Sequence, residues 1–144
     1  MFVVSSCLLG QKCRYNATDC YRPALLETLS DNYIKLCPEL LAGLSIPRLP
    51  CEIVGGGGKE VLRGNAVILD RQGADITDVM VAGARKAAEI CRQKGVTRAY
   101  LKSNSPTCGC GQVFDGSFTG TLTGGNGLFA ELLLQNGIDV VSIS

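Results

Sequence analysis

Phe2-Val-Val-Ser-Ser6 is followed directly by Cys7-Leu-Leu-Gly10 at the start of the chain, and this junction is the strongest indication of the fold. The first stretch is a short apolar run with β-branched residues, which is typical of a buried strand, and Gly10 permits a turn. The same order recurs where Tyr33-Ile-Lys-Leu36 is followed by Cys37-Pro38-Glu39. The pattern predicts two early strands that each end at a cysteine.

Helical patterns alternate with these strands. Residues 22–29 contain a proline near their first turn, and residues 76–94 carry apolar side chains at intervals of three and four before Gly95. A third helix is predicted at 128–134, and further strands are predicted at 97–101 and 138–142. Alternation on this scale predicts a single α/β domain over residues 1–144, a three-layer Rossmann-like fold with a mainly parallel central sheet and helices on both faces.

Three segments have the composition of loops. Residues 42–64 contain two prolines and a run of four glycines at 55–58, so we expect irregular structure with a short extended piece around residues 60–67. Residues 102–111 are rich in Gly, Pro, Ser and Asn, and residues 116–127 form a second stretch rich in glycine and threonine.

Composition excludes several classes of function. Fourteen Lys and Arg against 13 Asp and Glu give a net charge of +1, which argues against nucleic acid as a partner because phosphate contacts need local cations. The chain has no histidine, which excludes His-ligated zinc and the Ser-His-Asp and Cys-His catalytic arrangements. Proton transfer must therefore use Glu, Asp, Lys, Tyr, Cys or bound water.

The eight cysteines are expected to be reduced. Only six residues precede Cys7 and none is basic, which does not fit a signal peptide. No apolar run reaches the roughly 18 residues of a membrane span. We therefore expect a cytoplasmic protein without a membrane partner, in which cysteines are metal ligands, catalytic groups or core residues rather than disulfides.

Three cysteines follow predicted parallel strands. Cys7 and Cys37 come directly after their strands, and Cys108 follows the strand at 97–101 after a loop. The carboxyl ends of such strands form one edge of the sheet, where ligands bind. Three thiolates suit a soft metal, either in an iron-sulfur cluster or in a Cys-only zinc site. Any one of them is alternatively a core residue, the role we assign to Cys91 on the apolar face of the 76–94 helix.

Four sequence motifs resemble the thiouracil desulfidase family, and together they span essentially the whole chain. The motifs are Cys7-Leu-Leu-Gly-Gln-Lys-Cys13-Arg-Tyr-Asn16; Cys37-Pro-Glu39 with Gly43-Leu44 and Pro47-Arg48; Leu101-Lys102 with Ser105-Pro-Thr-Cys-Gly109; and Asp115-Gly-Ser-Phe118.

The resemblance implies a [4Fe-4S] cluster held by only Cys7, Cys37 and Cys108, with the fourth iron open. Such an iron binds the sulfur of a thiocarbonyl, and water then attacks the ring carbon. The implied substrate is a thiolated nucleobase or nucleoside, such as 4-thiouracil or 2-thiouracil, which yields uracil and hydrogen sulfide without net redox change. Three-ligand clusters are oxygen-labile, so protein prepared in air is expected to lose the cofactor.

Three polar side chains near the implied ligands are candidates for the chemistry. Glu39 is the best candidate for the proton carrier, because histidine is absent and Cys37 is two residues away. Ser103 and Ser105 are candidates for hydrogen bonding to the pyrimidine or to a cluster sulfide. The alternatives are a first-turn helix carboxylate for Glu39 and ordinary turn residues for both serines.

Cys51 and Cys110 depart from the family pattern, and Thr107 replaces a serine. Cys110 stands two residues from Cys108, so a thiolate there would close the cluster. Cys13 matches the family and is assigned a supporting role. Two other functions stay open: a four-cysteine iron-sulfur or zinc protein that binds or senses without turnover, and desulfuration of thiouridine in tRNA, which the low net charge disfavours.

Overall fold

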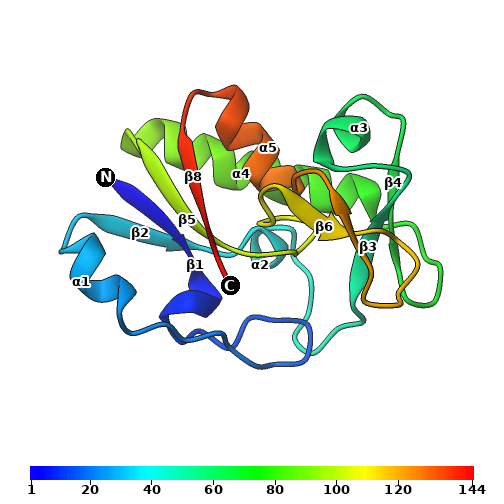
Figure 1. Ribbon diagram of the computed structural model, residues 1–144, viewed down its shortest axis with the longest axis horizontal. Helices are drawn as coiled ribbons and strands as arrows, with labels where there is room; N and C mark the ends of the chain where they lie inside the picture. The colour runs from blue at the N-terminus through cyan, green and yellow to red at the C-terminus, as the bar shows by residue number, and fades with distance from the viewer.

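A four-stranded parallel sheet forms the centre of the molecule in the computed structural model, which describes residues 1–144. Its strands, in the order β2-β1-β5-β8, are β2 (Tyr33–Leu36), β1 (Phe2–Ser5), β5 (Arg98–Lys102) and β8 (Asp139–Ile143). β1 pairs with both β2 and β5, and β5 pairs with β8, all in parallel register (Figure 1). All four strands predicted from the sequence are confirmed.

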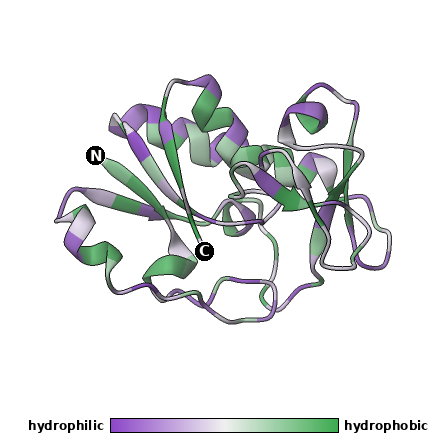
Figure 2. Cartoon of the chain, viewed as in Figure 1, coloured by the Kyte–Doolittle hydropathy of each residue, from purple (hydrophilic) through white to green (hydrophobic).

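Helices cover both faces of this sheet. Val3 and Ala99 point into the larger core, which they share with α4 (Thr77–Lys94) and α5 (Leu128–Gln135). Val4 and Tyr100, their neighbours along the strands, point into a smaller core with the 3-10 helix η1 (Ser6–Leu9) and α1 (Leu25–Leu29). Figure 2 shows the hydrophobic colour along β1, between the two helical layers. The predicted three-layer α/β fold with a mainly parallel sheet is confirmed.

Helix α4 is the longest helix and packs its apolar face against the larger core. Met80, Ala84, Ala87 and Cys91 on this face are fully buried or nearly so, which confirms the assignment of Cys91 to the core. Gly95, in the left-handed conformation, ends the helix as its sequence predicts. None of the helices combines the length and the hydropathy that a bilayer-spanning segment requires.

Two small antiparallel sheets of two strands each lie beside the central sheet. β3 (Cys51–Val54) pairs with β4 (Val67–Asp70), and α3 (Gly58–Leu62) lies between them in the chain. β6 (Gln112–Phe114) pairs with β7 (Leu122–Gly124). These pairs form the right-hand part of the molecule in Figure 1.

The expectations for residues 42–64 and 60–67 were wrong. The segment contains a strand and a helix, and the second extended piece begins only at Val67. The strand Cys51–Val54 has only four residues and no polar–apolar alternation, so its sequence does not stand out as a strand. Pairing with β4 stabilises it. The Glu60 carboxylate accepts the Gly57 N–H at 3.3 Å, which starts α3 inside a segment rich in glycine. The predicted helix at 22–29 is shorter and forms only as α1.

Helix α2 (Pro38–Leu41) crosses α4 at a glycine. Pro38 occupies the first turn of α2, where its missing N–H costs no hydrogen bond. A Cβ atom at Gly83 of α4 would lie 2.4 Å from the Pro38 carbonyl oxygen and 2.6 Å from the Ala42 Cβ. The close approach of the two helices therefore requires glycine at position 83 and fixes the position of Glu39 on α2.

Substitution Gly83→Ala is expected to lower the free energy of unfolding by about 2 kcal/mol, since the rigid α2 backbone cannot move away from the new methyl group. This loss outweighs the gain of about 1 kcal/mol in helix propensity. Urea denaturation measures the change. Gly124→Ala in β7, where a Cβ atom meets nothing within 4 Å, is the matched control. A Gly83→Ala protein as stable as the control would contradict the packing argument.

Candidate active site

A cavity of about 390 Å³ opens at the carboxyl edge of β1, β2 and β5. Five cysteines line it. They are Cys7, Cys13, Cys37, Cys51 and Cys108. The structure therefore brings the three predicted ligand residues to one cavity, together with two further thiols.

Parallel pairing explains why Cys7, Cys37 and Cys108 meet. Cys7 lies in η1 directly after β1, and Cys37 is the N-cap residue of α2 directly after β2. Cys108 lies in the loop that follows β5, and its side chain is 6% exposed. Because β1 pairs with β2 and with β5, all three segments leave the sheet at the same edge.

Cys13 lines the cavity with Cys7 and Cys37 and lies near enough to both for them to shift its pKa. Hydrogen bonding with Cys37 lowers the pKa of Cys13, but hydrogen bonding with Cys7, burial and the nearby charge of Glu39 outweigh it and raise that pKa to about 11. The hydrogen bond with Cys13 and burial raise the pKa of Cys37 well above the usual range. Without a cation, the Cys13 and Cys37 thiols are therefore neutral at physiological pH.

Burial also raises the pKa of Cys108 to about 12, although hydrogen bonds with Ser5 and Thr107 act in the opposite direction. Thiolates in this place need positive charge to compensate for the lost solvation. No three Cys, Asp or Glu side chains are arranged to hold a single metal ion, and five cysteines line the cavity. This set of soft donors fits an iron-sulfur cluster.

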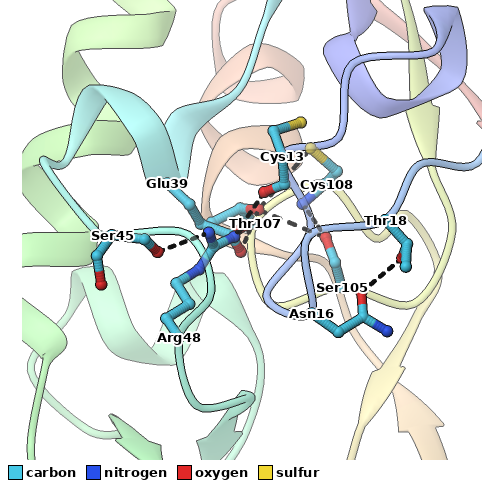
Figure 3. A network of polar contacts seen from close by, with 9 residues as sticks. All are labelled: Cys13, Asn16, Thr18, Glu39, Ser45, Arg48, Ser105, Thr107 and Cys108. Carbon is cyan, nitrogen blue, oxygen red and sulfur yellow. Dashed lines mark hydrogen bonds and ion pairs between the residues drawn. The ribbon is translucent and has the colours of Figure 1, made fainter.

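Glu39 is anchored beside the thiols by an ion pair and a weaker hydrogen bond (Figure 3). Arg48 Nη2 donates to Glu39 Oε2 at 2.5 Å and to the Cys13 carbonyl oxygen at 3.0 Å. Thr107 Oγ1 donates to Glu39 Oε1 at 3.4 Å. The side chains of Arg48 and Glu39 are only 10% and 16% exposed. The carboxylate thus links α2 to the segment of Cys13 and to the loop of Cys108.

Ser103 and Ser105 both line the cavity, and each also has a partner in the protein. Ser105 Oγ accepts the Cys108 N–H at 2.8 Å, so it fixes the backbone of a predicted ligand. Ser103 Oγ accepts from Lys102 Nζ at 3.0 Å. This contact of Ser105 fits the alternative given from the sequence, an ordinary turn residue. Contact of either serine with the substrate stays a prediction.

Close backbone contacts hold the Cys108 loop. The first amides of α5 face this loop, since Leu128 N donates to the Pro106 carbonyl and Phe129 N to the Thr107 carbonyl. A Cβ atom at Gly127 would lie 2.5 Å from the Thr107 carbonyl carbon. Gly58, the last residue of the four-glycine run, donates its N–H to the Asn126 carbonyl at 2.6 Å. The run at 55–58 therefore lets α3 approach the start of α5.

The remaining cysteines divide between site and core. Cys51 lines the cavity, and burial raises its pKa to about 12. Cys110 does not line the cavity and packs beside the larger core. Cys20 packs beside the smaller core.

Several residues that shape this site have no role that the sequence predicts. Ser5 accepts the Lys102 N–H at 3.0 Å across 97 residues of chain, and Thr107 and Arg48 both reach Glu39. Arg48 and Thr107 both stand in motifs that resemble the family, Pro47-Arg48 and Ser105-Pro-Thr-Cys-Gly109, and these motifs were the available signals. The other contacts depend on tertiary structure.

The comparisons with known proteins agree with this geometry. A model of the family described as 2-thiouracil desulfurase matches residues 2–144. The uncharacterized protein YbbK of Bacillus subtilis (strain 168) is 40% identical over 143 residues, which cover 99% of this chain and 95% of that protein. The solved structure of the [4Fe-4S]-dependent thiouracil desulfidase TudS is similar with a TM-score of 0.84 and 34% identity, over 98% of this chain and 89% of that one.

An α/β protein with a thiol-lined cavity at the carboxyl edge of its parallel sheet is thus matched over its whole length by one family. The chain belongs to the 2-thiouracil desulfurase family. The resemblance inferred from the sequence motifs is confirmed, as is the prediction of an enzyme of the desulfidase class.

Substitution Arg48→Met is expected to lower the free energy of unfolding by about 3 kcal/mol, because it leaves the mostly buried Glu39 carboxylate without its cation. Chemical denaturation measures this change. Arg92→Met is the matched control, since it breaks the exposed Arg92–Glu89 pair and should leave stability unchanged. Equal stability of the two variants would show that the Glu39–Arg48 pair does not anchor the site.

Proposed function

We propose that this protein is a [4Fe-4S]-dependent desulfidase that converts 2-thiouracil or 4-thiouracil to uracil and hydrogen sulfide. The observation that carries the proposal is the cavity at the ends of three neighbouring parallel strands, lined by Cys7, Cys37 and Cys108. The [4Fe-4S] dependence of TudS, which shares the fold over 98% of this chain, supports the choice of cofactor.

Cys7, Cys37 and Cys108 would hold the cluster, one from each strand end. When bound, the cluster supplies an iron without a protein ligand, a soft Lewis acid that polarises the carbon–sulfur bond of the substrate. Cys13 lies near two of these residues and would support them as a neutral thiol.

The overall reaction exchanges sulfur for oxygen. A thiocarbonyl and one water give a carbonyl and hydrogen sulfide, so the carbon–sulfur bonds break and carbon–oxygen bonds form. The carbon keeps its oxidation state, and no external electron donor is required. The protein therefore has to move protons, from the attacking water to the departing sulfur.

Glu39 is the proposed proton carrier. Its carboxylate lines the cavity beside the thiols, and no histidine exists in the chain to compete for the role. The ion pair with Arg48 fixes one oxygen, whereas Oε1 has only the long bond from Thr107. Oε1 is therefore the atom that would accept the proton of water and return it to sulfur.

Ser103 and Ser105 would orient the pyrimidine. Both hydroxyls line the cavity and lie on the loop that leads from β5 to Cys108. A thiolated pyrimidine offers ring N–H donors and an acceptor, which hydroxyl groups can satisfy in either direction.

One observation favours a second candidate function. Cys51 lines the cavity, so a fourth thiol is available near the proposed ligands. A cluster closed by four thiolates would bind or sense without turnover, since a filled site has no open position for substrate. Desulfuration of thiouridine in tRNA is disfavoured, because the chain has a net charge of only +1.

Replacement of single cysteines by serine separates these functions. Serine at Cys7, Cys37 or Cys108 is expected to abolish both iron binding and sulfide release from thiouracil, because a hard hydroxyl replaces a soft ligand. The measurements are iron content after anaerobic assembly and sulfide production.

Cys110→Ser and Cys51→Ser are the matched controls and are expected to keep iron and activity near the wild-type level. Cys110 lies outside the cavity, which makes it the stricter control. Loss of iron in Cys51→Ser, or a gain of activity, would show that Cys51 closes the cluster and would favour the non-catalytic function.

Substitution Glu39→Gln is expected to lower kcat by about 100-fold, since the amide cannot carry a proton. Iron content should stay at the wild-type level, because the carboxylate is not a proposed ligand. Unchanged turnover would remove Glu39 from the mechanism, and loss of iron together with activity would make it a structural residue.

A further inference from the structure

Phe118 stands in the cavity wall with a backbone conformation that bulky residues rarely adopt. Its φ angle is +58°, in the left-handed region. The side chain is partly exposed and lines the cavity. It belongs to neither of the two hydrophobic cores. Packing within the protein therefore does not account for the place of this ring.

A buried carboxylate holds Phe118 in this conformation. Glu52 on β3 is 9% exposed, and its Oε1 accepts the backbone N–H of Gly116 at 3.0 Å and of Phe118 at 3.1 Å. Hydrogen bonds to an ionised acceptor are among the strong ones in proteins. Glu52 thus ties the loop after β6 to β3 across more than 60 residues of chain.

Gly116 makes this approach possible. Its φ angle is +92°, and a Cβ atom there would lie 2.7 Å from the Ile53 carbonyl oxygen. Glycine is the residue that meets both requirements. The loop therefore lies directly on β3, and Phe118 is carried to the cavity by contacts that do not involve the ring itself.

Two more aromatic side chains line the same cavity without joining either core. They are Phe114, which is partly exposed at the end of β6, and Tyr15, which is 38% exposed. The cavity thus combines thiols and polar groups from the parallel sheet with an aromatic lining from the small hairpin and the Cys13 segment.

We propose that the Phe118 ring stacks on the pyrimidine ring of the substrate, and that Glu52 is a positioning residue that presents it. The inference rests on the proposed function, because it takes a pyrimidine as the ligand. A planar heteroaromatic ring prefers an aromatic face to an aliphatic one. Local backbone strain persists where surrounding contacts fix it, and such sites cluster where ligands bind.

The test compares Phe118→Asn with Phe118→Tyr in the cluster-containing enzyme. Asparagine tolerates the left-handed conformation but has no aromatic ring, and tyrosine keeps the ring. Phe118→Asn is expected to raise the KM for 4-thiouracil and the Kd for uracil about tenfold, which is within the range found when an aromatic side chain that stacks on a base is replaced by alanine. Its kcat and iron content should stay near wild type. Phe118→Tyr should behave like wild type in all four measurements.

The positioning role of Glu52 is tested by a second pair. Glu52→Gln keeps an acceptor oxygen and should retain wild-type KM and Kd. Glu52→Met removes it and should raise both values as Phe118→Asn does, with kcat retained. Leu122→Ala on β7 of the same hairpin lies outside the cavity and is the control for general damage to this hairpin.

Three results would overturn the inference. They are wild-type uracil binding in Phe118→Asn, equal loss of binding in Phe118→Tyr, and loss of iron or of the thermal transition together with binding in Phe118→Asn. Failure of the proposed function would give a different result from failure of this inference. Wild-type protein would then bind uracil but release no sulfide, and the uracil titration would still report on Phe118.

Discussion

Parallel pairing of β1 with β2 on one side and with β5 on the other is the constraint on which the site depends. It directs three distant segments of the chain to one edge of the sheet, where Cys7, Cys37 and Cys108 line a common cavity. The central strand β1 is largely buried, which fixes its register against β2 and β5. The position of Cys108 depends in addition on its own loop, which Ser105 and the first amides of α5 hold in place.

Charged side chains of both signs line the site. Glu39 and Glu52 share the cavity with Arg14, Arg48, Arg71 and Lys102, and Arg48 is paired with the Glu39 carboxylate. Although hydrogen bonding with Cys37 lowers the pKa of Cys13, hydrogen bonding with Cys7 together with burial raises it to about 11, and burial raises the pKa of Cys108 to about 12, so both thiols are protonated. The iron ions of a bound iron-sulfur cluster would replace the thiol protons and stabilise the thiolates. The charge of Glu39 is already balanced by Arg48, so this carboxylate is available for proton transfer and does not have to compensate the charge of a cofactor.

Sequence patterns were sufficient for the sheet and for the cysteines at its edge. Strand ends beside Cys7 and Cys37 are local features, and the periodicity of α4 is long enough to be unambiguous. The antiparallel pair of β3 and β4 was not predicted, because each strand is short and is stabilised by a partner strand that lies elsewhere in the chain. The contacts of Glu52 with the Phe118 loop were beyond the sequence for the same reason, although the Asp115-Gly-Ser-Phe118 motif marked the place.

We propose that an iron-sulfur cluster in the thiol-lined cavity removes sulfur from a thiolated pyrimidine without net redox change. Anaerobic incubation of the cluster-containing protein with 4-thiouracil, without any electron donor, measures this reaction. We expect uracil and sulfide in equal amounts over many turnovers, and no product from protein whose iron has been removed. Iron-containing protein that leaves thiouracil intact, or that produces sulfide only when a reductant is added, would contradict the proposal.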